Sequence, residues 1–364
     1  MNDQDFAIII GIDGYPQLPL LNGAHEDAME FKKWLVSPDG GWLPDSDSNI
    51  QILLSPDGIV ANPAKAFPKK DDIDIALDSF GLGNPNFEGR IGRRLYFYFS
   101  GHGVGPNFDD VAILMANASI NHLNNNVGVR PYRGMLKKTA RFKEIVVILD
   151  CCRDAVSGVT PADPAITQPI EFGPEHPVED FVIMASDWGQ KAFERTFTEA
   201  EVRSRLGVLT RTLLEGLNDP AAANDEGQIT SETLRLYVIK RMAAISIKTG
   251  VAQNPEFKRP SNKEIVFRTL PPDQINKVKV RILAPSGPGH DGNIVLRDGG
   301  SFDTIISQRA ARLLTINDPP WSEMLERNVY LVQHIHTGQS MGPIMSLDLR
   351  DKNSPYDFEF TNFN

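Results

Sequence analysis

Short apolar runs alternate with amphipathic segments over the first two thirds of the chain. The apolar runs predict strands at residues 6–12, 49–54, 94–100, 145–150, 181–186 and 264–267, with a shorter outer strand at 111–115. Between them, apolar residues recur with helical spacing, which predicts helices over residues 23–36, 71–80, 131–141, 207–217 and 231–244. Strands that alternate with helices predict an α/β fold with a doubly wound, mostly parallel sheet flanked by helices.

The pattern changes after residue 268. Residues 269–275 contain two prolines in succession, and we expect them to form a linker. Beyond it, apolar and polar residues alternate with a period of two in the segments 277–283, 292–297, 329–334, 345–349 and 356–360. We therefore expect residues 1–268 to form the larger domain and residues 276–364 to form a small, sandwich-like β domain.

Composition narrows the class of protein. The 364 residues are 41% hydrophobic, and their formal net charge of −10 argues against nucleic-acid binding, which requires a basic face. The two cysteines, Cys151 and Cys152, are adjacent and therefore unsuited to a structural disulfide, as expected of a protein in the reducing cytoplasm. The acidic first residues do not resemble a signal peptide, and residues 6–12 are too short to span a bilayer, so we expect a cytoplasmic location and no membrane partner.

Two of the predicted strands end beside residues that can carry out chemistry. His102 follows the strand at 94–100, and Cys151 and Cys152 follow the strand at 145–150. The carboxyl ends of parallel strands lie along one edge of an open α/β sheet, where such folds place their sites. An imidazole and a thiol at that edge predict a nucleophile and its base. We expect Cys151 to face the core and Cys152 to face the site, and the reverse assignment stays open.

Five segments, taken in order, resemble the motifs of the caspase and metacaspase clan of cysteine peptidases, family C14, in its bacterial form. They are residues 100–103 around His102, residues 150–153 around Cys152, residues 185–190 followed by Ala192 and Glu194, and residues 207–217 and 253–255, and the resemblance covers residues 6–267. The separation of about 50 residues between His102 and Cys152 is also typical of caspases. The resemblance implies a caspase-like domain in which Cys152 attacks the scissile carbonyl and His102 transfers protons. It further implies that the backbone N–H groups of Gly103 and Cys152 hold the oxyanion.

The resemblance also bears on which bond is cleaved. Metacaspases cleave after Arg or Lys and carry pocket aspartates at positions that match Asp27 and Asp150. Asp187, in a neighbouring loop, is a further candidate. Carboxylates around one slot would pair with a guanidinium or ammonium group, so we expect these three residues to bind a basic side chain of a protein or peptide substrate. A solvated helix residue is the alternative interpretation of Asp27.

We expect no cofactor and no metal ion. Metacaspases carry an acidic pair associated with calcium where this chain has Arg130 and Arg133, whose charge cannot replace carboxylate ligands. His334 and His336 alternate on one face of a predicted strand, as zinc ligands sometimes do, but no third ligand lies close to them in the sequence. The segment 154–190 contains no Lys or Arg, so an enzyme with this specificity is expected not to cut itself there.

Two functions from different classes fit these observations. The first is an endopeptidase controlled by a regulatory protein, with a stress, cell-suicide or antiphage role suggested by bacterial relatives in the clan. The second is a catalytically silent scaffold that binds partners through its C-terminal β domain. The intact thiol, imidazole and acidic residues favour the peptidase.

Overall fold

The chain divides into two compact units. The first comprises Met1–Arg195, Arg205–Asn218 and Thr230–Arg268, and the second comprises Thr196–Ser204, Asp219–Ile229 and Thr269–Asn364. The computed structural model describes residues 1–58, 62–84, 89–166, 177–199, 202–224, 226–260, 262–271, 277–283, 291–301, 304–311, 321–326, 328–337, 341–349, 352 and 356–359. Residues 272–275 of the expected linker lie outside the described residues.

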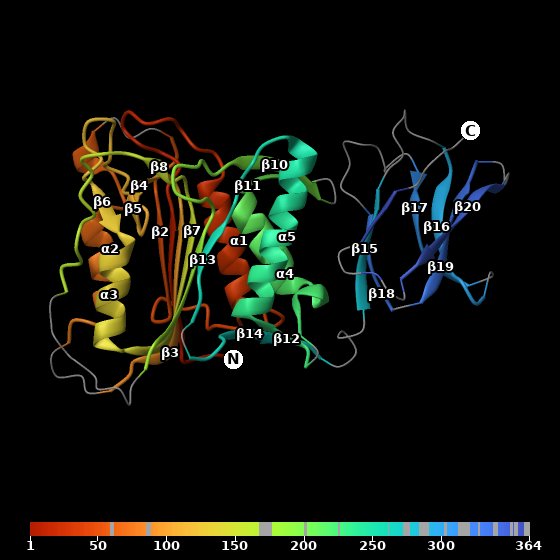
Figure 1. Ribbon diagram of the computed structural model, residues 1–364, viewed down its shortest axis with the longest axis horizontal. Helices are drawn as coiled ribbons and strands as arrows, with labels where there is room; N and C mark the ends of the chain where they lie inside the picture. The colour runs from red at the N-terminus through yellow and green to blue at the C-terminus, as the bar shows by residue number, and fades with distance from the viewer. Residues whose placement is uncertain are drawn as a thin grey trace. The chain divides into compact units, whose positions relative to one another are not determined.

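A six-stranded sheet forms the centre of the first unit (Figure 1). Its strands, in spatial order, are β13 (Glu256–Lys258), β9 (Glu179–Met184), β7 (Phe142–Asp150), β3 (Gly92–Ser100), β1 (Asp5–Gly11) and β2 (Ile50–Leu54). The last five strands of this order run parallel, and β13 runs antiparallel to β9. The chain extends the sheet in both directions from β1 and β3, which confirms the predicted doubly wound, mostly parallel sheet.

The register aligns the carboxyl ends of three central strands. Gly11 of β1 pairs with Ser100 of β3, and Ser100 pairs with Asp150 of β7. His102 and Cys152 each follow two residues later, so both leave the sheet at the same edge. The candidate nucleophile and base are therefore brought together by the pairing of β3 with β7.

Helices cover both faces of this sheet (Figure 1). One face carries α1 (Ala24–Val36), α4 (Val208–Asn218) and α5 (Ser231–Thr249), and the other carries α2 (Lys70–Ser79) and α3 (Val129–Thr139). The apolar face of α1 is buried as predicted, and Phe31 stacks on Tyr98 of β3 with ring centroids 4.6 Å apart. The short helices Pro63–Lys65 and Pro220–Ala222 are of the 3-10 type. None of the described helices is long and apolar enough to cross a membrane.

A second, smaller sheet ties the loop after His102 to the loop after Cys152. It contains, in spatial order, β6 (Asn126–Gly128), β5 (Asp110–Leu114), β4 (Gly103–Asn107) and β8 (Asp154–Ala155). The strand β4 begins one residue after His102, and β8 begins two residues after Cys152. Because Val104 of β4 pairs with Asp154 of β8, the two loops share backbone hydrogen bonds. The sequence predicted only the outer strand that corresponds to β5.

The strand expected at residues 264–267 does not join the large sheet. The structure places β14 (Val266–Thr269) in a separate two-stranded sheet, and the edge of the large sheet is β13. The sequence of a short apolar strand does not indicate which strand it pairs with. The strand β13 has charged residues at two of its three positions, so its hydrophobic pattern does not predict a strand.

The second unit is built from two antiparallel-rich sheets. One contains β18 (Trp321–Glu326), β15 (Lys277–Leu283) and β21 (Tyr356–Glu359), and the other contains β17 (Ile305–Ala310), β16 (Asn293–Asp298), β19 (Val329–Ile335) and β20 (Met341–Asp348). Residues from both sheets, including Val280 and Leu296, form one hydrophobic core. A core enclosed between two sheets is the arrangement of a β-sandwich.

The remaining short strands are β10 (Glu194–Glu199), β11 (Val202–Gly207) and β12 (Gln228–Thr230).

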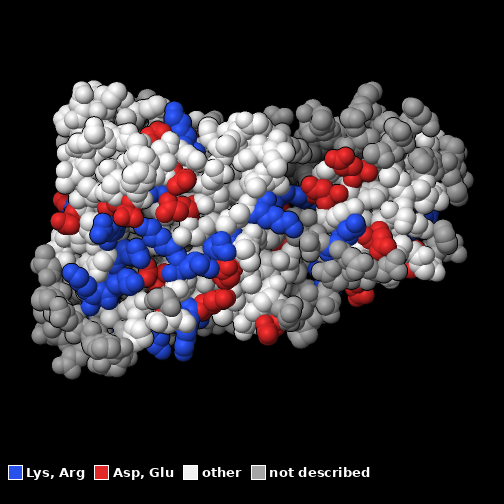
Figure 2. Space-filling view, viewed as in Figure 1, with Lys and Arg blue, Asp and Glu red and all other residues white. Residues whose placement is uncertain are grey.

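Charge is unevenly distributed on the first unit. Figure 2 shows Lys and Arg gathered on the visible face, in the region where Figure 1 draws α3. That helix contains Arg130, Arg133, Lys137 and Lys138. Two of these cations, Arg133 and Lys137, pair with Asp180 at the start of β9. The net charge of −10 therefore does not describe this face of the molecule.

Candidate active site

His102 is held by backbone and ring contacts on two sides. Its N–H donates to the hydroxyl oxygen of Tyr15 over 2.9 Å, and the ring centroids of the two residues lie 4.8 Å apart. The Tyr15 hydroxyl in turn donates to the carbonyl of Leu114. On the imidazole, Nε2 lies 2.7 Å from the carbonyl oxygen of Pro19. These contacts orient the ring before any substrate binds.

Cys152 lies in the turn after β7. Its side chain is half-buried, and the backbone N–H of Ala192 donates to Sγ over 3.3 Å. Cys151 is only 2% exposed and belongs to the hydrophobic core, as the sequence predicted. The Cys152 thiol is therefore more accessible to solvent than the neighbouring Cys151 thiol.

Arg153 anchors the turn that carries Cys152. Its guanidinium is fully buried, forms an ion pair with Glu256 of β13 and donates to the carbonyl of Phe108 over 2.9 Å. Its backbone N–H and C=O bond Gln190 and Gly189, respectively. The motif at 150–153 and the motif at 185–190 are thus joined around one buried cation.

A small hollow, partly open to solvent, brings the predicted catalytic and binding residues together. It is lined by Leu21, Asp27, Ser100, Gly101, His102, Asp150, Cys151, Cys152, Ala192, Phe193, Glu194 and Gly207. Both members of the predicted dyad and two of the three predicted pocket carboxylates are on this list. Among the described residues, no hydrogen bond joins His102 to Cys152. Such contacts are often long before substrate binds.

Burial opposes charge on both members of the dyad. It raises the pKa of Cys152 above its ordinary value, although the N–H of Ala192 acts in the opposite direction. It lowers the pKa of His102, and the hydrogen bond to Pro19 offsets part of this change. At neutral pH the resting pair is therefore a thiol and a neutral imidazole rather than an ion pair.

Two aspartates form the closed side of the hollow. Asp27 is 1% exposed, and its carboxylate accepts from the Ser100 hydroxyl over 2.6 Å and from the Gly207 N–H over 2.8 Å. Asp150 accepts from both the N–H and the hydroxyl of Thr210, each over 2.8 Å. Neither carboxylate has a cation among these donors. The position of Asp27 contradicts the alternative that it is a solvated helix residue.

Desolvation strongly affects these two acids. Burial, followed by the charge of nearby Asp150, raises the pKa of Asp27 well above its ordinary value. Burial raises the pKa of Asp150 to about 6, against the hydrogen bonds from Thr210. Among the described residues no cation pairs with either carboxyl group, and two buried carboxyl groups in this state are poised to bind one, because a bound cation would offset the cost of their charge.

Two predicted site residues do not line the hollow. Asp187 is exposed, and its carboxylate accepts the N–H of Trp188 in the following turn. Gly103 is buried at the start of β4, where an added Cβ would lie 2.6 Å from Sγ of Cys151 and 2.8 Å from the carbonyl oxygen of Cys152. Close packing against the cysteine turn therefore requires glycine at 103.

Two groups that contribute to the site were not predicted from the sequence. One is the carbonyl of Pro19, a backbone atom that no side-chain pattern reveals. The other is Glu194, a third carboxylate on the lining of the hollow, which accepts the N–H of Gly23 at the start of α1 over 3.1 Å. Its position two residues after Ala192, within a segment that resembles the family, was the available signal.

Two carboxylates near Arg130 and Arg133 already have N–H or cationic partners. Asp110 accepts the N–H groups of Arg130 and Val111, each over 2.8 Å. Asp180 is paired with Arg133 and Lys137. Carboxylates that already have these partners are poor candidates for calcium ligands.

Two sequence comparisons match this chain to known proteins. The sequence model of the caspase domain, which defines a peptidase family, matches residues 4–266. A probable protease from a Desulfuromonadales bacterium is 31% identical over 246 residues, which cover 65% of this chain and 28% of that protein. The chain thus corresponds to just over a quarter of the length of this relative.

Solved structures with a related chain trace are more distant. A protein from Geobacter sulfurreducens aligns over 74% of this chain and 96% of its own, with 13% identity and a TM-score of 0.42. Caspase-1 from Spodoptera frugiperda aligns over 74% of this chain and 91% of its own, with 14% identity and a TM-score of 0.40.

Proposed function

Since this chain belongs to the peptidase family defined by the caspase domain, we propose that it is a cysteine endopeptidase that cleaves proteins after Arg or Lys. One observation carries the proposal: a single hollow is lined by His102, Cys152 and two buried carboxylates, Asp27 and Asp150. The thiol and imidazole supply the chemistry, and the carboxylates supply a binding site for a cation. The probable protease among its relatives supports the activity.

The tautomer of His102 supports its role as the base. Because Nε2 faces the carbonyl of Pro19, it carries the proton, and Nδ1 carries the lone pair. In the proposed reaction Nδ1 takes the proton of the Cys152 thiol as sulfur attacks the scissile carbonyl carbon. The protonated ring then gives that proton to the leaving amine. A water molecule, deprotonated by the same nitrogen, hydrolyses the acyl-enzyme and releases the thiol.

The negative charge that develops on the scissile oxygen needs hydrogen-bond donors. We assign this role to the backbone N–H groups of Cys152 and Gly103, as the family resemblance implies. The pairing of Val104 with Asp154, one residue beyond Gly103 and two beyond Cys152, supports the assignment because it holds both turns in a fixed relation.

The acidic end of the hollow is the proposed site for the side chain that precedes the cleaved bond. Arg or Lys would enter between Asp27 and Asp150, and its charge would relieve the desolvation that raises the pKa of both carboxyl groups. Glu194 would add a third negative charge nearer the entrance. Asp187 is not retained in the pocket, because its carboxylate caps the neighbouring turn.

The chemistry of the thiol bears on the compartment in which the protein works. A free nucleophilic thiol requires a reducing compartment, which favours the cytoplasm. An endopeptidase with so broad a preference would need control by a regulatory protein, and a stress, cell-suicide or antiphage role would suit it. No cofactor is needed for the proposed steps.

The deciding experiment is turnover of a peptide panel that differs only in the residue before the scissile bond. The expected result is cleavage after Arg and Lys by the wild type, loss of at least a thousandfold in Cys152→Ala, and substantial retention in Cys151→Ala. The adjacent cysteine is the matched control, because it tests the reversed assignment of the pair. A thiol-reactive peptide with Arg at its end should label Cys152.

Other outcomes would redirect the proposal. Cleavage after Asp would retain the dyad and reject the acidic pocket. Activity that survives Cys152→Ala but not Cys151→Ala would reverse the nucleophile. Absence of both turnover and labelling would instead favour the catalytically silent scaffold.

A further inference from the structure

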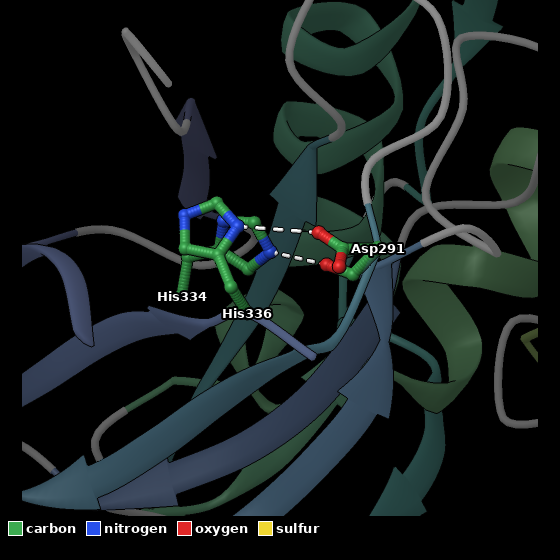
Figure 3. Close-up of side chains that lie close together, drawn as sticks. All are labelled: Asp291, His334 and His336. Atoms are coloured by element: carbon green, nitrogen blue, oxygen red, sulfur yellow. Dashed lines mark hydrogen bonds and ion pairs between the residues drawn. The ribbon is translucent and has the colours of Figure 1, made fainter. Parts of the chain in front are cut away.

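Three potential metal ligands meet in the second unit. Asp291, His334 and His336 each place a ligand atom within 4.8 Å of the others (Figure 3). Nε2 of His334 lies 2.6 Å from the backbone oxygen of Asp291, and Nδ1 of His336 lies 3.2 Å from its carboxylate oxygen Oδ1. Figure 3 shows both imidazoles turned toward Asp291.

Strand pairing explains why these distant residues meet. Asp291 lies just before β16, His334 is the penultimate residue of β19, and His336 directly follows that strand. The two strands are antiparallel neighbours in the same sheet, and Ile294 pairs with His334. Asp291 is thus 43 residues from His334 in sequence but adjacent in space. The third ligand that sequence analysis did not find is supplied by the neighbouring strand.

We propose that Asp291, His334 and His336 bind a divalent first-row transition metal ion, with zinc as the ion of choice. Two imidazole nitrogens and one carboxylate oxygen match the ligands that zinc takes from proteins. Such a donor set is too rich in nitrogen for calcium or magnesium, which prefer oxygen ligands. Bound zinc would replace the present His–Asp hydrogen bonds with bonds to the same ring nitrogens, and in a neutral imidazole the proton of the ligating nitrogen would move to the other ring nitrogen.

The environment of the cluster suits an ion that is held by three residues. His334 is fully buried, which limits its rotamers, whereas Asp291 and His336 are accessible from solvent. The imidazole centroids of the two histidines lie only 4.0 Å apart. This proximity disfavours two positive charges but suits two neutral ligands of one ion. The exposed side leaves a route of entry and room for a water molecule as the fourth ligand.

The inferred ion would connect the beginning of β16 to the end of β19. It would thereby link the two strands at one end of the sheet of β17, β16, β19 and β20 and stabilise the second unit by an amount that rises with the logarithm of the free zinc concentration above Kd. This role is separate from the peptidase chemistry of the first unit. The proposal does not depend on the function proposed above.

The test uses the full-length chain carrying Cys152→Ala, which removes the accessible thiol as a competing zinc ligand. The protein is stripped of metal with a chelator and titrated with zinc chloride by calorimetry, and the bound zinc is counted by elemental analysis after desalting. We expect one zinc per chain and a zinc-dependent rise in the unfolding temperature of the second unit. Asp291→Asn and His336→Gln should each weaken zinc binding at least tenfold.

The controls separate binding from folding. His336 and Asp291 are partly or fully exposed, so neither substitution should prevent folding, and circular dichroism of the metal-free variants checks this. His122→Gln, an exposed histidine in the first unit, should bind zinc like the parent protein. Zinc binding that is absent from the parent protein, or unchanged in both cluster variants, would overturn the proposal.

Discussion

The Nε2 atom of His102 lies 2.7 Å from the carbonyl oxygen of Pro19. A carbonyl oxygen only accepts, so this contact selects the tautomer in which Nδ1 is basic. In the usual arrangement of a catalytic dyad the base is oriented by a third group, and here that group is a backbone atom. The orientation of the base therefore survives any change of side chain at position 19 that keeps the local backbone.

The first prediction concerns the pH dependence of turnover. Burial lowers the pKa of His102, and the base must be neutral, so activity should persist below the ordinary histidine value of about 6.5 and fall only at lower pH. The measurement is kcat against pH at saturating substrate, where a bound basic side chain keeps Asp150 ionised. A midpoint of the acid limb above 6.5 would contradict the neutral dyad.

The second prediction concerns specificity. Asp27→Asn and Asp150→Asn preserve shape and most hydrogen bonds but each removes one negative charge from the pocket. We expect each substitution to lower kcat/KM for Arg substrates by roughly ten- to a thousandfold, in line with 1.5–4 kcal/mol for a charge-assisted contact. Labelling of Cys152 by a small neutral alkylating reagent should change much less. Undiminished cleavage after Arg would remove these residues from the pocket.

The third prediction links the same pocket to stability. The folded-state pKa of Asp150 is about 6, above the ordinary value of 3.8, so the folded protein binds this proton more tightly than the unfolded chain. The contribution of Asp150 to the free energy of unfolding is therefore greatest below pH 3.8 and is lost as pH rises through 6, by ~3 kcal/mol in total. Urea unfolding at several pH values should show a smaller loss toward alkaline pH in Asp150→Asn. Equal pH dependence in both proteins would refute the link.

The fourth prediction uses a pair of glycines. An added Cβ at Gly207 would lie 2.1 Å from Oδ2 of Asp150, so Gly207→Ala must displace the carboxylate from its place beside Thr210. We expect KM for Arg substrates to rise at least tenfold. The matched control is Gly134→Ala in α3, where no atom lies within 4 Å of the new Cβ and helix propensity should raise stability by up to ~1 kcal/mol. A similar KM in both variants would argue against a role for this carboxylate.

The fifth prediction concerns self-cleavage. The segment 154–190 has no Lys or Arg, so incubated protein should remain uncut there, whereas a cut after Arg203, Arg205 or a lysine at positions 65–70 is compatible with the proposed specificity. Intact mass and N-terminal sequencing after incubation distinguish these outcomes. Self-cleavage, followed in the same way, should proceed at equal rates with added calcium and with a chelator, because Asp110 and Asp180 already have N–H and cationic partners. A new terminus within 154–190 would contradict the proposed specificity.

Much of the first unit could be predicted because its elements are long and strongly patterned. The runs that became β1, β3 and β7 are almost continuously apolar, and strands of this kind are buried on both faces. The helix α1 was predicted to within one residue at its start, because its apolar positions follow helical spacing. By contrast, β13 and β14 are short, so their hydrophobic content could not say which of them joins the large sheet.

The sequence by itself determined that His102 and Cys152 each follow a buried apolar strand, since the length and composition of an apolar run are local properties. Only the tertiary structure decided that Asp27, Asp150 and Glu194, rather than Asp187, line the hollow beside them. It also decided that Asp291 lies against His334 and His336. Such approaches depend on loop paths and on pairing between distant strands, and these are set by the packing of the whole unit rather than by any local pattern.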